Sequence, residues 1–409
     1  MAERARPSPH VVMLVRNPFT HDSRVEKEAR ALLDAGCRVT VVADAADGLP
    51  ARERRNGIEV RRVGRRLRRI PGLRYLVHEA RLTRVLRRLR PDVLHAHDSN
   101  ALVAVGWAAR SLRVPFVYDA HDLWLGRPRR ERSRLYFALN QVLYGAVERA
   151  FVPRAAAVLT VSEPIALYLE RAHGLRAVHV VANYPEPGRD GERRELRSLV
   201  GGGSIGHRGP VALYLGGLMA GRGLEQLVDA IGLAASTELA LLGDGPIASD
   251  LLRRAANAGA ADRVHLLAPV PPEEVIAYAA SADIGVSPIV PSSLNYRYSL
   301  PNKLFQYMAA GIPVVASDLP QVREVVEGAG CGVVVDTTRP AAIAEAIERL
   351  AADPEEARAM GRRGRAAVQE RYNWREAAAV LLRAYAGLIG HRPRTGQAMV
   401  EMPGADDTR

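Results

Sequence analysis

The sequence predicts an α/β protein made of two domains. Short apolar segments typical of buried parallel strands alternate with amphipathic segments of helical spacing, and this alternation restarts after a break near the middle of the chain. The break, residues 185–209, is rich in glycine, proline and charge, which indicates a linker. A chain of 409 residues is also long enough for two cores. We therefore expect domains at 1–184 and 210–372, a final helix over 373–390 and a disordered tail over 391–409.

The positive charge of the chain is concentrated in one stretch. Residues 52–90 contain fifteen arginines against Glu53, Glu59 and Glu79, which accounts for the whole formal net charge of +12. A basic block of this kind is typical of proteins that bind an anionic surface, either lipid head groups or nucleic acid. Tyr75 is the only Phe, Trp or Tyr in it, which counts against stacking on single-stranded nucleic acid. An arginine-rich composition without any surface role is the alternative.

Neither the cysteines nor the hydropathy indicates secretion. Cys37 and Cys331 lie far apart in apolar surroundings, so we expect no disulfide or metal framework and a reducing, cytoplasmic location. The apolar run near the N-terminus is five residues long, and no apolar stretch of eighteen residues occurs. The sequence therefore predicts neither a signal peptide nor a membrane span.

The first domain opens with a strand, a helix and a strand. His10–Val15 and Arg38–Ala43 are apolar enough to be buried strands. Between them, Ser23 and Glu26 have the spacing of a capping box, and Gly36 suits the end of the helix. The turn before this helix lacks the G-x-G-x-x-G fingerprint, so we expect no tightly held dinucleotide here.

Polar residues follow the strands of the first domain, where open parallel sheets bind ligands. The clusters are His95–Asp98, Asp119–Asp122 and Ser162-Glu163. Arg24, in the first turn of the first helix, faces the same end, although pairing with Glu28 would explain it as well. Hydrogen bonding to a polyhydroxylated ligand accounts for these clusters better than a metal does, because no D-x-D, H-x-x-E-H or paired C-x-x-C motif accompanies them.

Two segments of the first domain combine arginines with an apolar stripe. Residues 129–150 predict a long helix with a basic start followed by leucines and aromatic residues. Residues 73–89 predict a basic amphipathic helix, which would either pack on the domain's own sheet or lie on a bilayer surface. Its stripe consists of Leu73, Leu76, Val77, Ala80, Leu82, Val85, Leu86 and Leu89.

The second domain repeats the alternation and adds glycine-rich turns. Strands are predicted at Val211–Leu215, Leu239–Leu242 and Ile284–Val286. The turn over residues 216–223 places Arg222 among glycines directly before a helix, a composition that suits a phosphate. Such turns are common between strands and helices, so this one is a weak signal alone.

The sharpest local signal is Ser299–Asp318, which predicts a loop, a helix and a strand. Pro301 fits the helix start and Gly311 its left-handed end. Unpaired N–H groups at such a helix start bind phosphate well. Lys303 strengthens this interpretation, because Lys27 is the only other lysine in the chain and a lysine offers a compact point charge. A capped helix with a solvated lysine is the plainer alternative.

Several motifs together resemble the family 4 glycosyltransferases, retaining enzymes of the GT-B fold. They are HDSRVEKEARALLDAG, LHAHD, YDAHD, LYLGGLMAGRGLEQLVDAI, LLGDGP, ADIGVSPI and SLPNKLFQYMAAGIPVVASDLPQVREVV, spread over nearly the whole chain. The resemblance implies two facing Rossmann-like domains with a central cleft. It places the nucleotide-sugar donor mainly on the second domain and the acceptor mainly on the first, with a C-terminal helix crossing back to the first.

The resemblance also assigns residues to roles. It implies that Arg222 and Lys303 bind the donor diphosphate, that His121 approaches the transferred sugar, and that these three residues serve catalysis. The donor side would consist of Gly217, Arg222, Gly243, Asp244, Gly245, Asn302, Lys303, Gln306 and Glu324. The acceptor side would include Arg24, Asp98 and Asp122.

The sequence departs from the family's pattern at three of these places. Tyr298 and Gln306 occupy the positions of a characteristic pair of glutamates, and Gly217 stands where an arginine is usual. A glutamine can still accept one hydrogen bond from a ribose hydroxyl, but without the strength of a charged acceptor. We therefore expect donor binding that is weaker or differently tuned.

The resemblance implies transfer of a sugar from a nucleotide diphosphate to an acceptor hydroxyl, with no metal or other cofactor. A lipid-linked or glycan acceptor in cell-surface polysaccharide or glycolipid assembly is expected, with peripheral attachment of the enzyme to the inner face of the membrane through residues 52–90. The alternatives are a GT-B sugar-nucleotide epimerase and a non-catalytic binder of anionic surfaces. No nucleic acid partner is expected.

Overall fold

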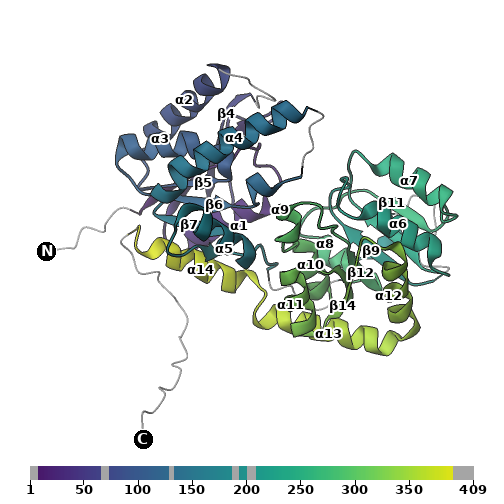
Figure 1. Cartoon of the computed structure of the whole chain (residues 1–409). Helices are drawn as coiled ribbons and strands as arrows, with labels where there is room; N and C mark the ends of the chain where they lie inside the picture. The colour runs from purple at the N-terminus through teal and green to yellow at the C-terminus, as the bar shows by residue number, and fades with distance from the viewer. Residues whose placement is uncertain (1–7, 66–72, 129–132, 187–192, 200–208, 390–409) are drawn as a thin grey trace, which may run out of the picture.

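The computed structural model describes residues 8–65, 73–128, 133–186, 193–199 and 209–389. Within these residues the chain forms two α/β domains joined at one side (Figure 1). The expected tail, much of the linker and the basic residues 129–132 lie outside the described residues.

The sheet of the first domain has the strand order β3-β4-β2-β1-β5-β6-β7-β8, and every pair except β3–β4 is parallel. The predicted strands are confirmed. The hairpin of β3 and β4 was not predicted, because β3 (RERR) contains no apolar residue and the apolar-polar alternation of β4 (IEVRRVGR) breaks at Arg62. The strands are β1 (His10–Leu14), β2 (Arg38–Ala45), β3 (Arg52–Arg55), β4 (Ile58–Arg65), β5 (Val93–His97), β6 (Phe116–Ala120), β7 (Ala157–Thr160) and β8 (His179–Val180).

The first helix begins at Ser23, as predicted, but its cap residue differs from the prediction. Asp22, not Ser23, caps it, since the Asp22 carboxylate accepts a hydrogen bond from the Val25 N–H at 3.3 Å. A carboxylate satisfies an unpaired N–H and also favours the positive helix end. The helices of this domain are α1 (Ser23–Asp34), α2 (Leu73–Arg88), α3 (Leu102–Leu112), α4 (Arg134–Phe151) and α5 (Glu163–His173).

The stripe of α2 is divided between core and surface. Leu82 and Leu86 are fully buried against the first-domain core, as the packing alternative requires. Leu76 and Val77, nearer the start of the helix, are half or more exposed. The prediction of a core stripe is therefore right for the second half of α2 only.

The second domain has the parallel strand order β11-β10-β9-β12-β13-β14, which is that of a Rossmann fold. Its strands are β9 (Val211–Leu215), β10 (Glu238–Leu242), β11 (Val264–Leu267), β12 (Ile284–Ser287), β13 (Val314–Ser317) and β14 (Gly332–Val335). Its helices are α6 (Leu224–Leu233), α7 (Ala248–Asn257), α8 (Val275–Ala279), α9 (Leu294–Arg297), α10 (Asn302–Ala310), α11 (Pro320–Ala329), α12 (Pro340–Ala352) and α13 (Pro354–Glu370).

Helix α10 lies at the centre of the second-domain core. Leu304, Phe305, Tyr307 and Met308 are buried in it, and Gly311 ends the helix at φ 76°, in the left-handed region that was predicted. Pro301 is the cap residue in extended conformation rather than part of the first turn. The fixed φ of proline thus sets the approach to the helix.

The last helix, α14 (Trp374–Ala386), returns to the first domain, as the resemblance implies (Figure 1). Its Trp374, Leu381 and Tyr385 are buried in the core beneath β1 and α1. The chain leaves the first domain beside the start of this helix, because the Trp374 N–H donates to the Pro185 carbonyl at 2.8 Å. No helix among the described residues is long and apolar enough to cross a membrane.

Candidate functional site

A cavity of about 830 Å³ lies between the carboxyl ends of the two sheets. It brings together most of the residues singled out in the sequence, namely Arg24, His121, Asp122, Gly217, Arg222, Gly243, Asp244, Asn302, Lys303 and Gln306. Asp98, Gly245 and Glu324 are not among its lining residues. The cavity thus lies in the interdomain cleft where the site was predicted, and three of the predicted residues lie outside its wall.

The second-domain wall of the cavity carries two basic side chains. The Lys303 ammonium lies 3.8 Å from the centre of the Tyr214 ring, and Arg222 donates to the Gly217 carbonyl at 3.4 Å. Among the described residues, neither cation forms an ion pair with a carboxylate. Burial, together with the positive charge of Arg222, holds the pKa of Lys303 well below its ordinary value. This wall is therefore short of negative charge, which an anionic ligand would supply.

The start of α10 adds to this positive wall. Its cap residue, Pro301, makes no side-chain hydrogen bond to the helix, and Pro301, Asn302 and Lys303 all line the cavity. The first N–H groups of a helix lack partners within the helix and carry a partial positive charge. The start of α10 thus lies at the cavity wall, where the sequence analysis expected a phosphate to bind.

The turn after β10 needs its glycines for packing as well as for any ligand. A Cβ at Gly243 would lie 2.2 Å from the Gly216 carbonyl oxygen, and one at Gly245 would lie 2.1 Å from that of Leu218. Both residues therefore hold this turn against the glycine turn after β9. Gly245 has this structural reason to be glycine and is not part of the cavity wall.

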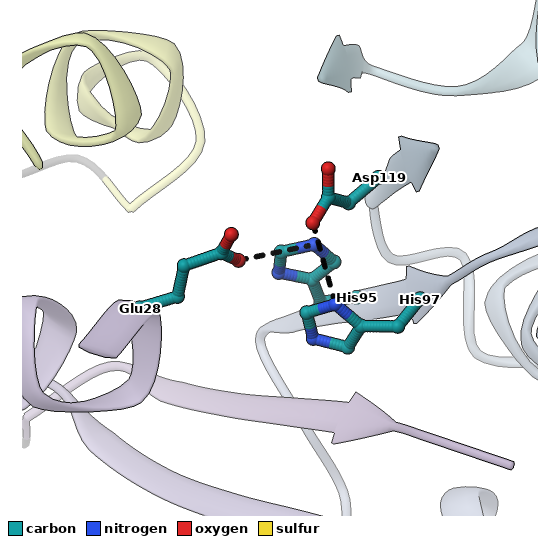
Figure 2. A group of neighbouring side chains, drawn as sticks. All are labelled: Glu28, His95, His97 and Asp119. Carbon is teal, nitrogen blue, oxygen red and sulfur yellow. Dashed lines mark ion pairs between the residues drawn. The ribbon is translucent and has the colours of Figure 1, made fainter. Parts of the chain in front are cut away.

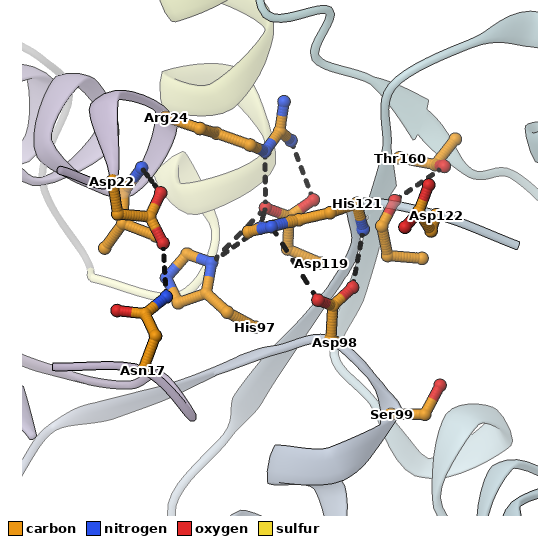
Figure 3. A network of polar contacts seen from close by, with 12 residues as sticks. Asn17, Asp22, Arg24, His97, Asp98, Ser99, Asp119, His121, Asp122 and Thr160 are labelled. Carbon is orange, nitrogen blue, oxygen red and sulfur yellow. Dashed lines mark hydrogen bonds and ion pairs between the residues drawn. The ribbon is translucent and has the colours of Figure 1, made fainter. Parts of the chain in front are cut away.

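The first-domain wall is built on a buried ion pair (Figure 3). Arg24 binds both carboxylate oxygens of Asp119, at 2.9 and 2.7 Å, and lies 3.0 Å from a Glu28 oxygen. Arg24 thus pairs with Glu28, as the alternative explanation expects, and it also lines the cavity. A bidentate pair holds both side chains in fixed positions.

His121 is the residue of this network that reaches the cavity. Its Nε2 lies 2.9 Å from an Asp119 oxygen and 3.0 Å from Nδ1 of His97, and the backbone N–H of His121 donates to the Asp98 carboxylate at 3.1 Å. Burial opposes protonation of His121, but the carboxylates of Asp98 and Asp119 outweigh it and raise its pKa to about 9. His121 is therefore an imidazolium near neutral pH, a hydrogen-bond donor rather than a base.

Four buried side chains behind His121 could in principle hold a metal ion (Figure 2). Glu28, His95, His97 and Asp119 offer ligand atoms that lie within 4.8 Å of one another. Arg24, however, already contacts both carboxylates of this group. The Arg24 guanidinium thus places a positive charge beside both carboxylates of this group.

The segment between β12 and α10, which contains the short helix α9, bridges the two walls of the cavity. Asn295 accepts from the Leu123 N–H at 2.8 Å and donates to the Asp122 carboxylate at 3.1 Å. Farther along this segment, the Ser162 hydroxyl donates to the Tyr298 carbonyl at 2.8 Å. Sequence reasoning missed Asn295, since no motif marks a residue whose partners are more than 170 positions away.

A second cavity of about 580 Å³, also between the domains, is lined by two residues that the resemblance linked to the donor. Tyr298 and Glu324 line it, together with Glu163 and Arg171 of α5. Tyr298 also packs against the first-domain core. Neither Tyr298 nor Glu324 lines the larger cavity, so this structure gives them no position beside the cations of Arg222 and Lys303.

The fold and the cavity define the class. Two Rossmann-like domains face each other across a cleft, with an anion-attracting wall on the second domain and a helix crossing back to the first, as in GT-B glycosyltransferases. Residues 23–184 match the model of Glycosyltransferase Family 4, and residues 209–353 match that of Glycosyl transferases group 1.

Comparisons over longer stretches agree. The chain is 30% identical over 320 residues to a D-inositol 3-phosphate glycosyltransferase of Xylanimonas cellulosilytica, covering 74% of this chain and 73% of that protein. It is 26% identical to a 2-deoxystreptamine glucosyltransferase of Streptomyces kanamyceticus, covering 90% and 98%. The chain belongs to glycosyltransferase family 4.

A solved structure of the same fold contains a nucleotide. The crystal structure of Anabaena HepE in complex with UDP and glucose superposes with a TM-score of 0.72 at 16% identity, covering 93% of this chain and 100% of that one. At this identity the likeness shows the shared fold alone.

Proposed function

We propose that this glycosyltransferase binds a nucleotide-diphosphate sugar and transfers the sugar to an acceptor hydroxyl with retention of anomeric configuration and without a metal. The carrying observation is the wall of Lys303 and Arg222 at the start of α10, where two cations lack a carboxylate partner among the described residues. A diphosphate would supply the missing negative charge. The UDP in the HepE structure supports a nucleotide donor for this chain.

The proposed reaction breaks the bond between the anomeric carbon and the diphosphate oxygen. Negative charge grows on the leaving diphosphate, where Lys303, Arg222 and the start of α10 stabilise it. The acceptor oxygen forms the new bond to the same face of the anomeric carbon. Its proton passes to the departing phosphate oxygen, so the reaction needs no strongly basic side chain.

His121 serves the sugar rather than the proton transfer in this proposal. As an imidazolium fixed by Asp119, it donates a hydrogen bond to a sugar oxygen on the first-domain side of the cavity. Asp122 and Arg24 line the cavity beside it, where the acceptor enters. Gln306, on the second-domain side, accepts from a ribose hydroxyl.

For the acceptor, we infer a lipid-linked or glycan molecule at the inner face of an anionic membrane, in cell-surface polysaccharide or glycolipid assembly. The exposed arginines of α2 support this location. A small polyhydroxylated ring is the second candidate acceptor, because the names of two relatives contain 2-deoxystreptamine and inositol 3-phosphate.

Ligand-dependent melting of the protein tests the donor. One nucleotide-diphosphate sugar of a UDP, GDP, ADP and TDP panel should raise the Tm of the native chain, and EDTA should not reduce the shift. Lys303→Ala should abolish the shift and lower kcat about 100- to 1000-fold, the usual effect of removing one transition-state donor. Equal donor binding by Lys303→Ala would refute the proposal.

The products distinguish transfer from epimerisation and inversion. NMR of the glycoside formed from an α-linked donor should show an α linkage. An epimerase would instead interconvert the nucleotide sugar with no acceptor present. Release of an altered nucleotide sugar under those conditions would favour the epimerase.

A further inference from the structure

Helix α4 carries an unusual exposed apolar stripe. Leu135, Leu139 and Val142 are 70%, 59% and 68% exposed. Their spacing places them on one face of the helix. Tyr136 and Leu143, also exposed, widen this face. Single exposed leucines need no explanation, but a stripe of large aliphatic side chains along one helix indicates a binding surface.

The stripe is confined to the first half of α4. Val147 and Glu148 in the second half are buried against the first domain. Since burial of the second half holds the helix in place, the apolar stripe of the first half is not needed for the core. Its composition therefore requires another explanation.

Exposed basic residues lie on the neighbouring helix α2. Arg81, Arg84 and Arg88 are exposed, and none of them forms an ion pair among the described residues. Helix α3 packs against both α2 and α4 (Figure 1). The arginines of α2 and the stripe of α4 thus lie on two helices that pack against the same helix.

The arginines of β3 and β4 differ from those of α2. Arg62 is buried and donates to the Pro18 and Pro50 carbonyls and to Glu53, and Arg61 pairs with Glu59. The basic block seen in the sequence therefore has two parts. Several arginines of the hairpin form contacts within the protein, whereas the arginines Arg81, Arg84 and Arg88 of α2 are exposed.

The apolar stripe is connected to the site. The Tyr144 ring of α4 packs on the Trp124 ring at 4.7 Å between ring centres. The Arg127 guanidinium lies 3.9 Å from the centre of the same Trp124 ring. Arg127 pairs with Asp122, which lines the main cavity. A short chain of contacts thus leads from α4 to the first-domain wall.

We propose that the stripe of α4 inserts among the lipids of an anionic bilayer while the arginines of α2 contact the lipid head groups. Aliphatic side chains flanked by unpaired cations suit this partner, because the acyl chains accept the aliphatic side chains and the anionic head groups accept the cations. The inference rests on the proposed function, since it presents the cavity to an acceptor held in the same membrane.

Co-sedimentation of the full chain with vesicles tests this. Wild type should bind phosphatidylglycerol-containing vesicles, less so at high salt, and bind pure phosphatidylcholine vesicles at least about tenfold more weakly. Leu135→Ser/Leu139→Ser/Val142→Ser should weaken binding to the anionic vesicles at least about tenfold. The matched control Leu233→Ser/Leu252→Ser, exposed leucines of the second domain, should bind as wild type does.

Two results would overturn the inference. One is unchanged vesicle binding by the triple variant. The other is a wild-type dimer in solution that the triple variant dissociates while neither binds vesicles, since the stripe would then join two copies of the chain. Nucleotide-sugar melting shifts should be equal in all variants, so loss of vesicle binding with intact donor binding separates this inference from the proposed function.

Discussion

The two walls of the cavity treat charge in opposite ways. On the first domain, Arg24 and His121 are matched by Asp119, with Asp98 and Glu28 beside them. On the second domain, Lys303 and Arg222 have no carboxylate partner among the described residues. One wall is electrostatically complete before any ligand arrives, and the other is completed by the ligand.

This difference suits the two tasks of a transferase. A wall that positions a sugar gains from side chains locked by one another, because their geometry is then fixed in advance. A wall that stabilises a leaving group must instead offer charge that is free to act when negative charge develops. The cost is that Lys303 is buried in an environment that disfavours its charge.

The largest expected effect comes from breaking the matched wall. Asp119→Asn should lower the free energy of unfolding by about 3–5 kcal/mol, because it leaves Arg24 buried without its main partner. Urea denaturation of the variant and of wild type measures this. Asp98→Asn, at a partly exposed carboxylate, should cost less than about 1 kcal/mol.

The pKa of His121 provides a second test of the Asp119→Asn variant. Loss of the Asp119 charge should lower that pKa from about 9, which NMR titration of the imidazole follows. A loss of stability below 1 kcal/mol with an unchanged histidine titration would mean that the wall is not held by this pair.

A smaller effect should follow from the protonation of Lys303. Its pKa lies below the ordinary value in the free protein, and a bound diphosphate would raise it, so donor binding should take up a proton. Affinity should then fall by up to about tenfold per pH unit as the pH rises between the free and bound pKa values. Calorimetry in buffers of different ionisation enthalpy measures the uptake.

Lys303→Arg is the matched control, since a guanidinium stays protonated across this range. Its donor affinity should be flat with pH, whatever its absolute value. Proton uptake that persists in Lys303→Arg would assign the linkage to another group and weaken the contrast between the two walls.

The smallest expected effect comes from Gln306→Glu, which adds a carboxylate to the unmatched wall. A charged acceptor should strengthen the bond to a ribose hydroxyl and tighten nucleotide binding about three- to tenfold. Isothermal titration with the nucleoside diphosphate measures it. Gln306→Ala should weaken the same interaction, and identical affinities for all three proteins would remove Gln306 from the donor site.

Much of the fold could be predicted because it depends on local patterns. The bounds of β9 and the end of α10 at Gly311 agree with the prediction, since apolar runs and a left-handed glycine act over a few residues. The β3–β4 hairpin was missed for the opposite reason. Arg62 is buried there through contacts with residues up to 44 positions away, which local composition does not reveal.

Much of the cavity wall could also be predicted, through residue types at the ends of strands. Lys303, Arg222 and His121 stand where parallel sheets bind ligands. Asn295 was beyond reach, because its role consists of contacts with Asp122 and Leu123 on the other domain. Glu324 was carried over by likeness alone, and it lines the smaller cavity.

The two-domain α/β architecture and the kinds of charged group at the cleft follow from the sequence, because strand pattern, helix ends and glycine turns are encoded within short segments. Which of those charges are matched depends on the tertiary structure. Whether a buried arginine or lysine finds a carboxylate depends on which distant strand ends meet, and that pairing separates the wall around Asp119 from the wall around Lys303.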